Sequence, residues 1–224
     1  MNLKPIDTVI FDLGGVLIDW DPRYLYRKIL KEDQIDWFLN NICTAEWNDQ
    51  QDAGRSFEEA TRELVETYPE WEEAITAWYG RWKETIRGPV IESVDLLGKI
   101  KEKKTFRLYA LTNWSAETFP WALENFEFLH WFEGIVVSGK ENTRKPFPEI
   151  YHTLFSRFNV DPSSSLFIDD SIRNIETGER LGLQTIHFQN PSQLKAALIE
   201  KKILVSQRRR PKNYRLRNTL TRSA

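Results

Sequence analysis

Residues 8–16 read TVIFDLGGV, and this stretch decides the fold expected of the chain. Its first half is a short β-branched and apolar run, typical of a strand buried on both faces of a parallel sheet. The run ends in the carboxylate of Asp12, and Gly14 and Gly15 then let the backbone turn sharply and approach a ligand. A charge at the tip of a buried strand is costly unless a ligand, a metal ion or a neighbouring group compensates it. Asp12 is therefore a candidate nucleophile or metal ligand. The plainer interpretation, an Asp that only ends a strand, is equally open on this motif alone.

The chain beyond residue 100 alternates short apolar runs with helical patterns. Strands are expected at 106–112, 134–138, 165–169 and 184–188. Helices are expected between them, one from a cap at Ser115 to about Asn125, one with Pro148 in its first turn, and one from a cap at Ser171 to Gly182. Such alternation predicts an α/β protein with a Rossmann-like, doubly wound parallel sheet and right-handed crossovers.

The segment between the first two expected strands breaks this alternation. Residues 22–88 hold no convincing strand and several amphipathic helical stretches, and Asp21 before Pro22 is a good helix start. Since the segment is entered directly from the first strand, it predicts a helical cap over the edge of the sheet where ligands bind. The expected organisation is a core of residues 1–20 and 89–206, a cap of residues 21–88 and a basic tail of residues 207–224.

Length and composition limit the class of protein. With 224 residues, the chain fits one compact domain and a smaller inserted module. Its apolar runs are too short to span a bilayer, and its first residues lack the apolar centre of a signal peptide. The single cysteine, Cys43, rules out an intramolecular disulfide. A cytoplasmic enzyme, present as a monomer or weak dimer and away from the membrane, is therefore the default expectation.

The charge is unevenly distributed along the chain. From residue 207 onward there are seven basic residues and no acid, which leaves 24 of the 31 basic residues against all 33 acidic ones. The body of the protein thus carries a net charge of about −9. An acidic body argues against nucleic acid as the main partner, because phosphate backbones need a basic surface. The tail reads most simply as a solvated extension, and an adaptor for RNA or a partner protein is the alternative.

Three further polar segments end at the same predicted edge of the sheet. Thr112 and Asn113 follow the second strand and carry groups that can donate hydrogen bonds to phosphate oxygens. Lys145, which precedes a proline, is suited to neutralising a phosphoryl group and a carboxylate together. Asp169 and Asp170 follow an apolar strand, and two adjacent acids favour a hard cation such as Mg²⁺. Each segment alone has an ordinary structural interpretation, as a turn, a solvated lysine or a helix cap.

The order and spacing of the four segments resemble the haloacid dehalogenase superfamily over about residues 6–204. The stretches FDLGGVLIDWDP, LTNW, RKPFPEIY and FIDDSIRNIETGERLG are particularly similar to the subgroup that contains a bacterial glucose-1-phosphate phosphatase and the phosphatase domain of soluble epoxide hydrolase. The resemblance implies a Rossmann-like core with a helical cap. It also implies Mg²⁺-dependent hydrolysis of a small phosphorylated metabolite through an aspartyl-phosphate, with sugar phosphates among the candidates.

The resemblance also implies roles for individual residues. Asp12 would attack phosphorus, and Lys145 would orient it and offset negative charge. The remaining roles would be phosphate and substrate binding by Thr112, Asn113, Trp114 and Lys145, and Mg²⁺ binding by Asp12, Asp170 and the carbonyl of Gly14, with Asp169 as a second ligand or as support for one. A phosphoryl transition state requires an in-line nucleophile and fixed positive charge, which agrees with these roles.

Gly14 departs from the commonest pattern of the family. A second Asp usually stands there, to protonate the leaving group and later activate water, and such help is worth roughly 10²–10⁴ in rate. Asp19 and Asp21 are the nearest substitutes, and a good leaving group could do without an acid. The alternative function is a phosphate-ligand binding or regulatory protein with little turnover. Dehalogenation is disfavoured, because that branch uses no metal and lacks the paired acids of Asp169 and Asp170.

Overall fold

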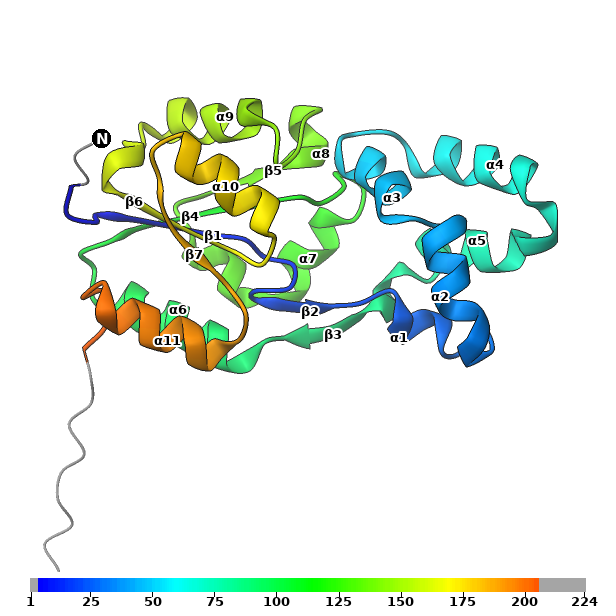
Figure 1. Cartoon of the computed structure of the whole chain (residues 1–224), viewed down its shortest axis with the longest axis horizontal. Coiled ribbons are helices and arrows are strands. Elements are labelled where there is room, and N and C mark those ends of the chain that lie inside the picture. Colours follow the sequence, from blue (N-terminus) through cyan, green and yellow to red (C-terminus); the bar gives the residue numbers. More distant parts are fainter. Residues whose placement is uncertain (1–3, 206–224) are drawn as a thin grey trace, which may run out of the picture.

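A five-stranded parallel sheet forms the centre of the computed structural model, which describes residues 4–205 (Figure 1). Its strands, in spatial order, are β5 (Gly134–Val137), β4 (Arg107–Thr112), β1 (Thr8–Phe11), β6 (Ser165–Asp169) and β7 (Gln184–His187). All four neighbouring pairs are parallel, which confirms the predicted α/β sheet. Phe11, the last residue of β1, lies opposite Ala110 and Ile168, so β4 and β6 extend past it by two residues and one residue, and the three central strands end close together.

Helices cover both faces of the sheet, as a doubly wound fold requires. On one face lie α6 (Ile91–Glu102), α7 (Phe119–Asn125) and α11 (Pro191–Glu200), and on the other lie α8 (Ser138–Glu141), α9 (Pro148–Phe158) and α10 (Ile172–Arg180) (Figure 1). Alternate residues of β1 supply the two cores: Val9 and Phe11 pack toward the first face and Ile10 toward the second. In α9 the buried Ile150, Tyr151 and Leu154 follow helical spacing.

A separate group of helices lies beyond the end of the sheet where β1 stops (Figure 1). It consists of α1 (Arg23–Tyr26), α2 (Glu32–Asn41), α3 (Ala45–Asp52), α4 (Phe57–Thr67) and α5 (Glu72–Gly80). These helices share a hydrophobic core of their own, in which the rings of Trp47 and Trp78 meet edge to face at 5.6 Å. Asp21 caps α1 as expected, because its Oδ1 accepts a hydrogen bond of 2.8 Å from the amide of Arg23.

Two expectations about local structure were wrong. Residues 22–88 were expected to lack strands, yet β3 (Ile86–Pro89) pairs antiparallel with β2 (Ile18–Trp20). A four-residue strand that contains Gly88 and Pro89 has no alternating apolar pattern, and its partner lies far away in sequence. The helix expected from Ser115 begins instead at Phe119. The Ser115 hydroxyl accepts from the amide of Glu117, which forms a turn before the helix.

Short 3₁₀ helices complete the described structure: η1 (Pro69–Trp71), η2 (Trp82–Thr85), η3 (Glu127–Trp131) and η4 (Pro162–Ser164). Within residues 4–205, no helix is both long enough and apolar enough to cross a membrane. The basic tail predicted from residue 207 lies outside the described residues.

Candidate active site

The turn after β1 holds the carboxylate of Asp12 at the edge of the sheet. The side chain is largely buried, and its Oδ1 accepts a hydrogen bond of 2.7 Å from the amide of Leu13. The turn closes through a 2.9 Å bond from the amide of Gly15 to the carbonyl of Ile18. Gly15 has a φ of +72°, in the left-handed region that glycine adopts at little cost. Gly15 thus allows the tight turn that the sequence predicts.

Lys145 lies between two carboxylates and is completely buried. Its Nζ is 2.8 Å from Oδ2 of Asp12 and 2.6 Å from Oδ2 of Asp169. The Asn113 side chain fixes the Lys145 backbone from both sides, since Nδ2 donates to the carbonyl (3.0 Å) and Oδ1 accepts from the amide (2.8 Å). The amide group of Asn113, expected to face phosphate, is therefore engaged in positioning Lys145.

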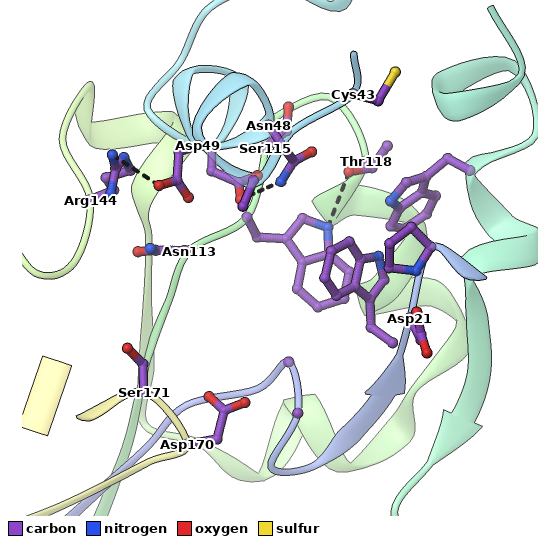
Figure 2. Close-up of a pocket in the computed structure, with 18 of the residues that line it drawn as sticks. Asp21, Cys43, Asn48, Asp49, Asn113, Ser115, Thr118, Arg144, Asp170 and Ser171 are labelled. Atoms are coloured by element: carbon purple, nitrogen blue, oxygen red, sulfur yellow. Dashed lines mark hydrogen bonds and ion pairs between the residues drawn. The ribbon is translucent and has the colours of Figure 1, made fainter. Parts of the chain in front are cut away.

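The adjacent acids after β6 have different surroundings. Asp169 is wholly buried, and its Oδ1 accepts from the amide of Ser171 (2.8 Å) and from Nδ2 of Asn174 (2.9 Å). Asp170 is exposed and faces the cavity in Figure 2. The contacts of Asp169 favour a supporting role, whereas Asp170 is open to a ligand. Sequence reasoning did not single out Asn174, although its place in the first turn of the following helix put it within reach.

Among residues 4–205, the charges that meet at this edge do not balance. The carboxylates of Asp12, Asp169 and Asp170 face one lysine, which leaves a formal charge of −2. Burial raises the pKa of Asp12 well above its usual range, although Lys145 pulls in the other direction. The pKa of Asp170 is raised too, because its carboxylate is partly desolvated at the rim of the cavity and lies beside the charge of Asp169. Burial opposes the charge of Lys145, but Asp12 and Asp169 outweigh it and raise its pKa.

The same residues fit a divalent cation and an anionic ligand. Asp12, Asp169 and Asp170 each offer an oxygen, and these atoms lie within 4.8 Å of one another. Hard oxygen donors that carry two uncompensated negative charges are suited to Mg²⁺. Nearby, the hydroxyl of Thr112 is buried without a hydrogen-bond partner among the described residues. An unpaired buried hydroxyl is costly, so it suits a site that is completed by a ligand oxygen.

A cavity of about 770 Å³ opens between this edge and the helices α1–α5 (Figure 2). Trp114 lines it and is largely buried, with its Nε1 donating to the Thr118 hydroxyl at 3.1 Å. Asp19 and Asp21 also line the cavity, but both have other partners. Asp19 accepts from the hydroxyl of Tyr24 at 2.8 Å, and Asp21 caps α1. Both acids are therefore held in structural contacts.

Gly15→Ala is expected to weaken Mg²⁺ binding at least ~10-fold. A Cβ at position 15 would stand 2.3 Å from Oδ2 of Asp170, and the left-handed φ would also strain an alanine. The carboxylate of Asp170 must then move away from the cluster. Gly14→Ala is the matched control, because a Cβ there meets nothing within 4 Å. Calorimetric titration with MgCl₂ checks both variants, and equal Mg²⁺ affinities would contradict the role of the Gly15 backbone.

Residues 6–182 match the family model of haloacid dehalogenase-like hydrolases, so the chain belongs to this family. It is 24% identical over 197 residues to D-ribitol-5-phosphate phosphatase of Bacteroides thetaiotaomicron, covering 83% of this chain and 93% of that protein. It is 26% identical to human N-acylneuraminate-9-phosphatase, with 85% of each chain covered. A solved enzyme of the family from B. thetaiotaomicron, in complex with magnesium and inorganic phosphate, superposes with a TM-score of 0.61 at 25% identity, over 83% of this chain and 95% of that chain.

Proposed function

We propose that the protein is a Mg²⁺-dependent phosphatase that hydrolyses a small phosphomonoester through an aspartyl-phosphate on Asp12. The observation that carries this proposal is the buried lysine between two of three clustered carboxylates, at the edge of a cavity large enough for a small metabolite. Three clustered acids with one counter-charge are unfavourable without a cation. The related phosphatases and the related magnesium–phosphate complex support the same assignment.

Each of these side chains has a role in the proposed mechanism. An Asp12 oxygen attacks phosphorus, the bond from phosphorus to the leaving oxygen breaks, and the alcohol oxygen takes up a proton from solvent water. Water then attacks the aspartyl-phosphate, which releases inorganic phosphate and restores the carboxylate. Lys145 holds Asp12 in place and offsets the charge of the phosphoryl group, and Asp169 holds Lys145.

Mg²⁺ would be bound by Asp12, Asp170 and the carbonyl of Gly14, with Asp169 as a further ligand or as support. The bound ion would supply positive charge that neutralises the transferring phosphoryl group. Thr112 is proposed to donate its unpaired hydroxyl to a phosphoryl oxygen. Trp114 would pack against the alcohol part of the substrate.

A direct assay tests the proposal. The purified protein is expected to release phosphate from p-nitrophenyl phosphate and from members of a phosphosugar panel, and EDTA should abolish the activity. Sugar phosphates are included because relatives named for ribitol 5-phosphate and N-acylneuraminate 9-phosphate act on polyhydroxylated compounds. Equal rates with Mg²⁺ and with EDTA would contradict the proposal.

The alternative proposal, a binding or regulatory protein with little turnover, rests on Gly14. The position has room for a larger residue, since a Cβ there meets nothing within 4 Å. Tight binding of a phosphate ester in calorimetry, together with no turnover by the wild type, would favour this alternative. Measurable turnover would exclude it. The monomer or weak dimer expected from the sequence stays a prediction.

Gly14→Asp is expected to raise kcat for alkyl phosphates by roughly 10²-fold, because it restores a group that can protonate the leaving oxygen. The gain with p-nitrophenyl phosphate should be far smaller, since p-nitrophenolate leaves without a proton. Gly14→Asn is the matched control of nearly the same size, and it cannot shuttle a proton. Steady-state kinetics with both substrates decide the matter. An equal gain in the Asn variant would show that proton transfer is not the cause.

A further inference from the structure

The wall of the cavity opposite the proposed catalytic residues is formed by α3. Figure 2 shows Asn48 and Asp49 on the far side of the cavity from Asp170 and Ser171. Asp52 lies one helical turn after Asp49 and also lines the cavity. Two carboxylates from one helix therefore face the space that the alcohol part of a substrate would occupy.

The charge of the first carboxylate, Asp49, is compensated by an arginine of the sheet domain. Asp49 Oδ2 is 3.0 Å from a guanidinium nitrogen of Arg144, and both side chains are mostly buried. Arg144 also donates to the carbonyl of its neighbour Lys145 at 3.1 Å. The charge of Asp49 is therefore committed to holding the cap against the loop that carries Lys145.

The second carboxylate has no such partner. Among residues 4–205, no Lys, Arg or His nitrogen lies within 4 Å of Asp52. Its Oδ2 accepts from Nδ2 of Asn48 at 3.1 Å, and the backbone of Ser115 supplies one further hydrogen bond. Burial, with Asp49 as the second cause, raises the pKa of Asp52 to about 7. Above about pH 7, where it is ionised, Asp52 thus presents to the cavity unused acceptor capacity and a charge that has no ion-pair partner among the described residues.

The cations around the cavity offset the charge of Asp52 only in part, since Arg144 lowers its pKa but burial and Asp49 raise it by more. Arg23 is paired with Asp36 at 2.7 Å, and Lys145 is held between Asp12 and Asp169. Arg173 follows Ser171 at the start of α10, on the side of the cavity where the phosphoryl group would bind. On this wall Asp49 is matched by Arg144, whereas the ionised carboxylate of Asp52 has no ion-pair partner among residues 4–205.

We infer that Asp52 selects substrates whose alcohol part ends in a hydrogen-bond donor and rejects those that end in a second anion. This inference rests on the proposed function. A hydroxyl or ammonium group would use the free acceptor capacity of Asp52, whereas a carboxylate or a second phosphate would face a like charge in a partly desolvated site. The cavity of about 770 Å³ has room for such an alcohol several carbons long. The substrate class is a monophosphate of a polyol or of an aminated polyol.

Three compounds that differ only at the far carbon test this inference. Glucitol 6-phosphate ends in a hydroxymethyl group, 1-amino-1-deoxyglucitol 6-phosphate in an ammonium group, and 6-phosphogluconate in a carboxylate. At about pH 8.5, where Asp52 is ionised, the wild type is expected to show a kcat/KM for the first two that exceeds that for the third by roughly 10-fold or more. The order of the first two tells whether a hydroxyl or an ammonium group is the better match.

Asp52→Asn should bring the three kcat/KM values to within a few-fold of one another. Glu46→Gln is the matched control, because it removes an equal charge from an exposed position on the same helix outside the cavity. It should keep the wild-type ratios. Circular dichroism reports whether the variants are folded, and Asp52→Ser, a smaller uncharged replacement, provides a second variant if Asp52→Asn is not.

Two results would overturn the inference: a wild-type kcat/KM for the carboxylate compound as high as for the others, or unchanged ratios in Asp52→Asn. The hydrolysis of p-nitrophenyl phosphate, which lacks a chain that ends near Asp52, is measured in parallel. If p-nitrophenyl phosphate is not hydrolysed, the proposed function fails. Calorimetric affinities for the same three compounds then decide whether Asp52 discriminates among them. If it is present and the three compounds are indistinguishable, only the inference about Asp52 fails.

Discussion

Asp12→Asn is expected to lower kcat by about 10⁴-fold or more while the protein remains folded. The substitution replaces the proposed nucleophile by a group of nearly the same shape that does not attack phosphorus. Lys145 keeps its 2.6 Å contact with Asp169, so its charge does not become unpaired. Because burial and neighbouring carboxylates raise the pKa of Asp12, the loss of its charge should leave the free energy of unfolding unchanged or increase it.

Phosphate release from p-nitrophenyl phosphate and urea denaturation together check this result. Asp95→Asn is the control, since Asp95 is an exposed acid on α6 and lines no part of the cavity. It should leave both kcat and stability close to the wild type. Retention of wild-type, metal-independent activity in Asp12→Asn would show that another residue attacks phosphorus and that the proposed mechanism is wrong.

The sheet could be predicted because its strands are short apolar runs separated by helical patterns. The expected runs at 8–13 and 165–169 contain β1 and β6, and the family assignment from the four polar segments is confirmed. The pairing of β2 with β3 could not be predicted, because it joins residues almost seventy positions apart without an alternating pattern. The more specific subgroup suggested by the resemblance stays a prediction.

The polar residues of the site could be named from the sequence, but the role of each one could not. Asn113 was expected to bind phosphate, and Asp169 to bind Mg²⁺ or to support a ligand. Their hydrogen bonds hold Lys145 and the start of α10, and their contacts with a ligand stay a prediction. The hydrogen-bond partner of each side chain depends on distances in the folded protein, and the spacing of residues in the sequence does not give these distances. The pair of Asp49 with Arg144 was missed for a related reason, since it joins two segments far apart in the chain.

Lys145→Met is expected to destabilise the protein by roughly 3–5 kcal/mol at pH 8 in the absence of Mg²⁺. The long apolar side chain of methionine can fill much of the space of the lysine stem, so the loss comes chiefly from charge. Asp12 and Asp169 would be left buried without the ammonium group that lies within 2.8 Å of both. The kcat should fall as well, because Asp12 would lose the contact that orients it.

The pH dependence of this loss distinguishes a missing charge from a packing defect. Without Lys145 the folded-state pKa of Asp12 rises further above the unfolded value, so the folded protein binds more protons than the unfolded one. Its stability then falls as the pH rises from the ordinary range of Asp toward the raised folded pKa. Urea denaturation should therefore show a smaller difference from the wild type at pH 5 than at pH 8, and Mg²⁺ should restore part of the loss at pH 8.

Lys195→Met is the matched control, because Lys195 is exposed on α11 and should change stability by less than ~0.5 kcal/mol. A loss in Lys145→Met that is equal at both pH values and insensitive to Mg²⁺ would indicate a packing defect. That result would remove the argument that a buried cation holds the carboxylate cluster together. A loss that grows with pH and is reduced by Mg²⁺ would show that the lysine and the metal ion compensate the same charge, as expected if both act on Asp12 during phosphoryl transfer.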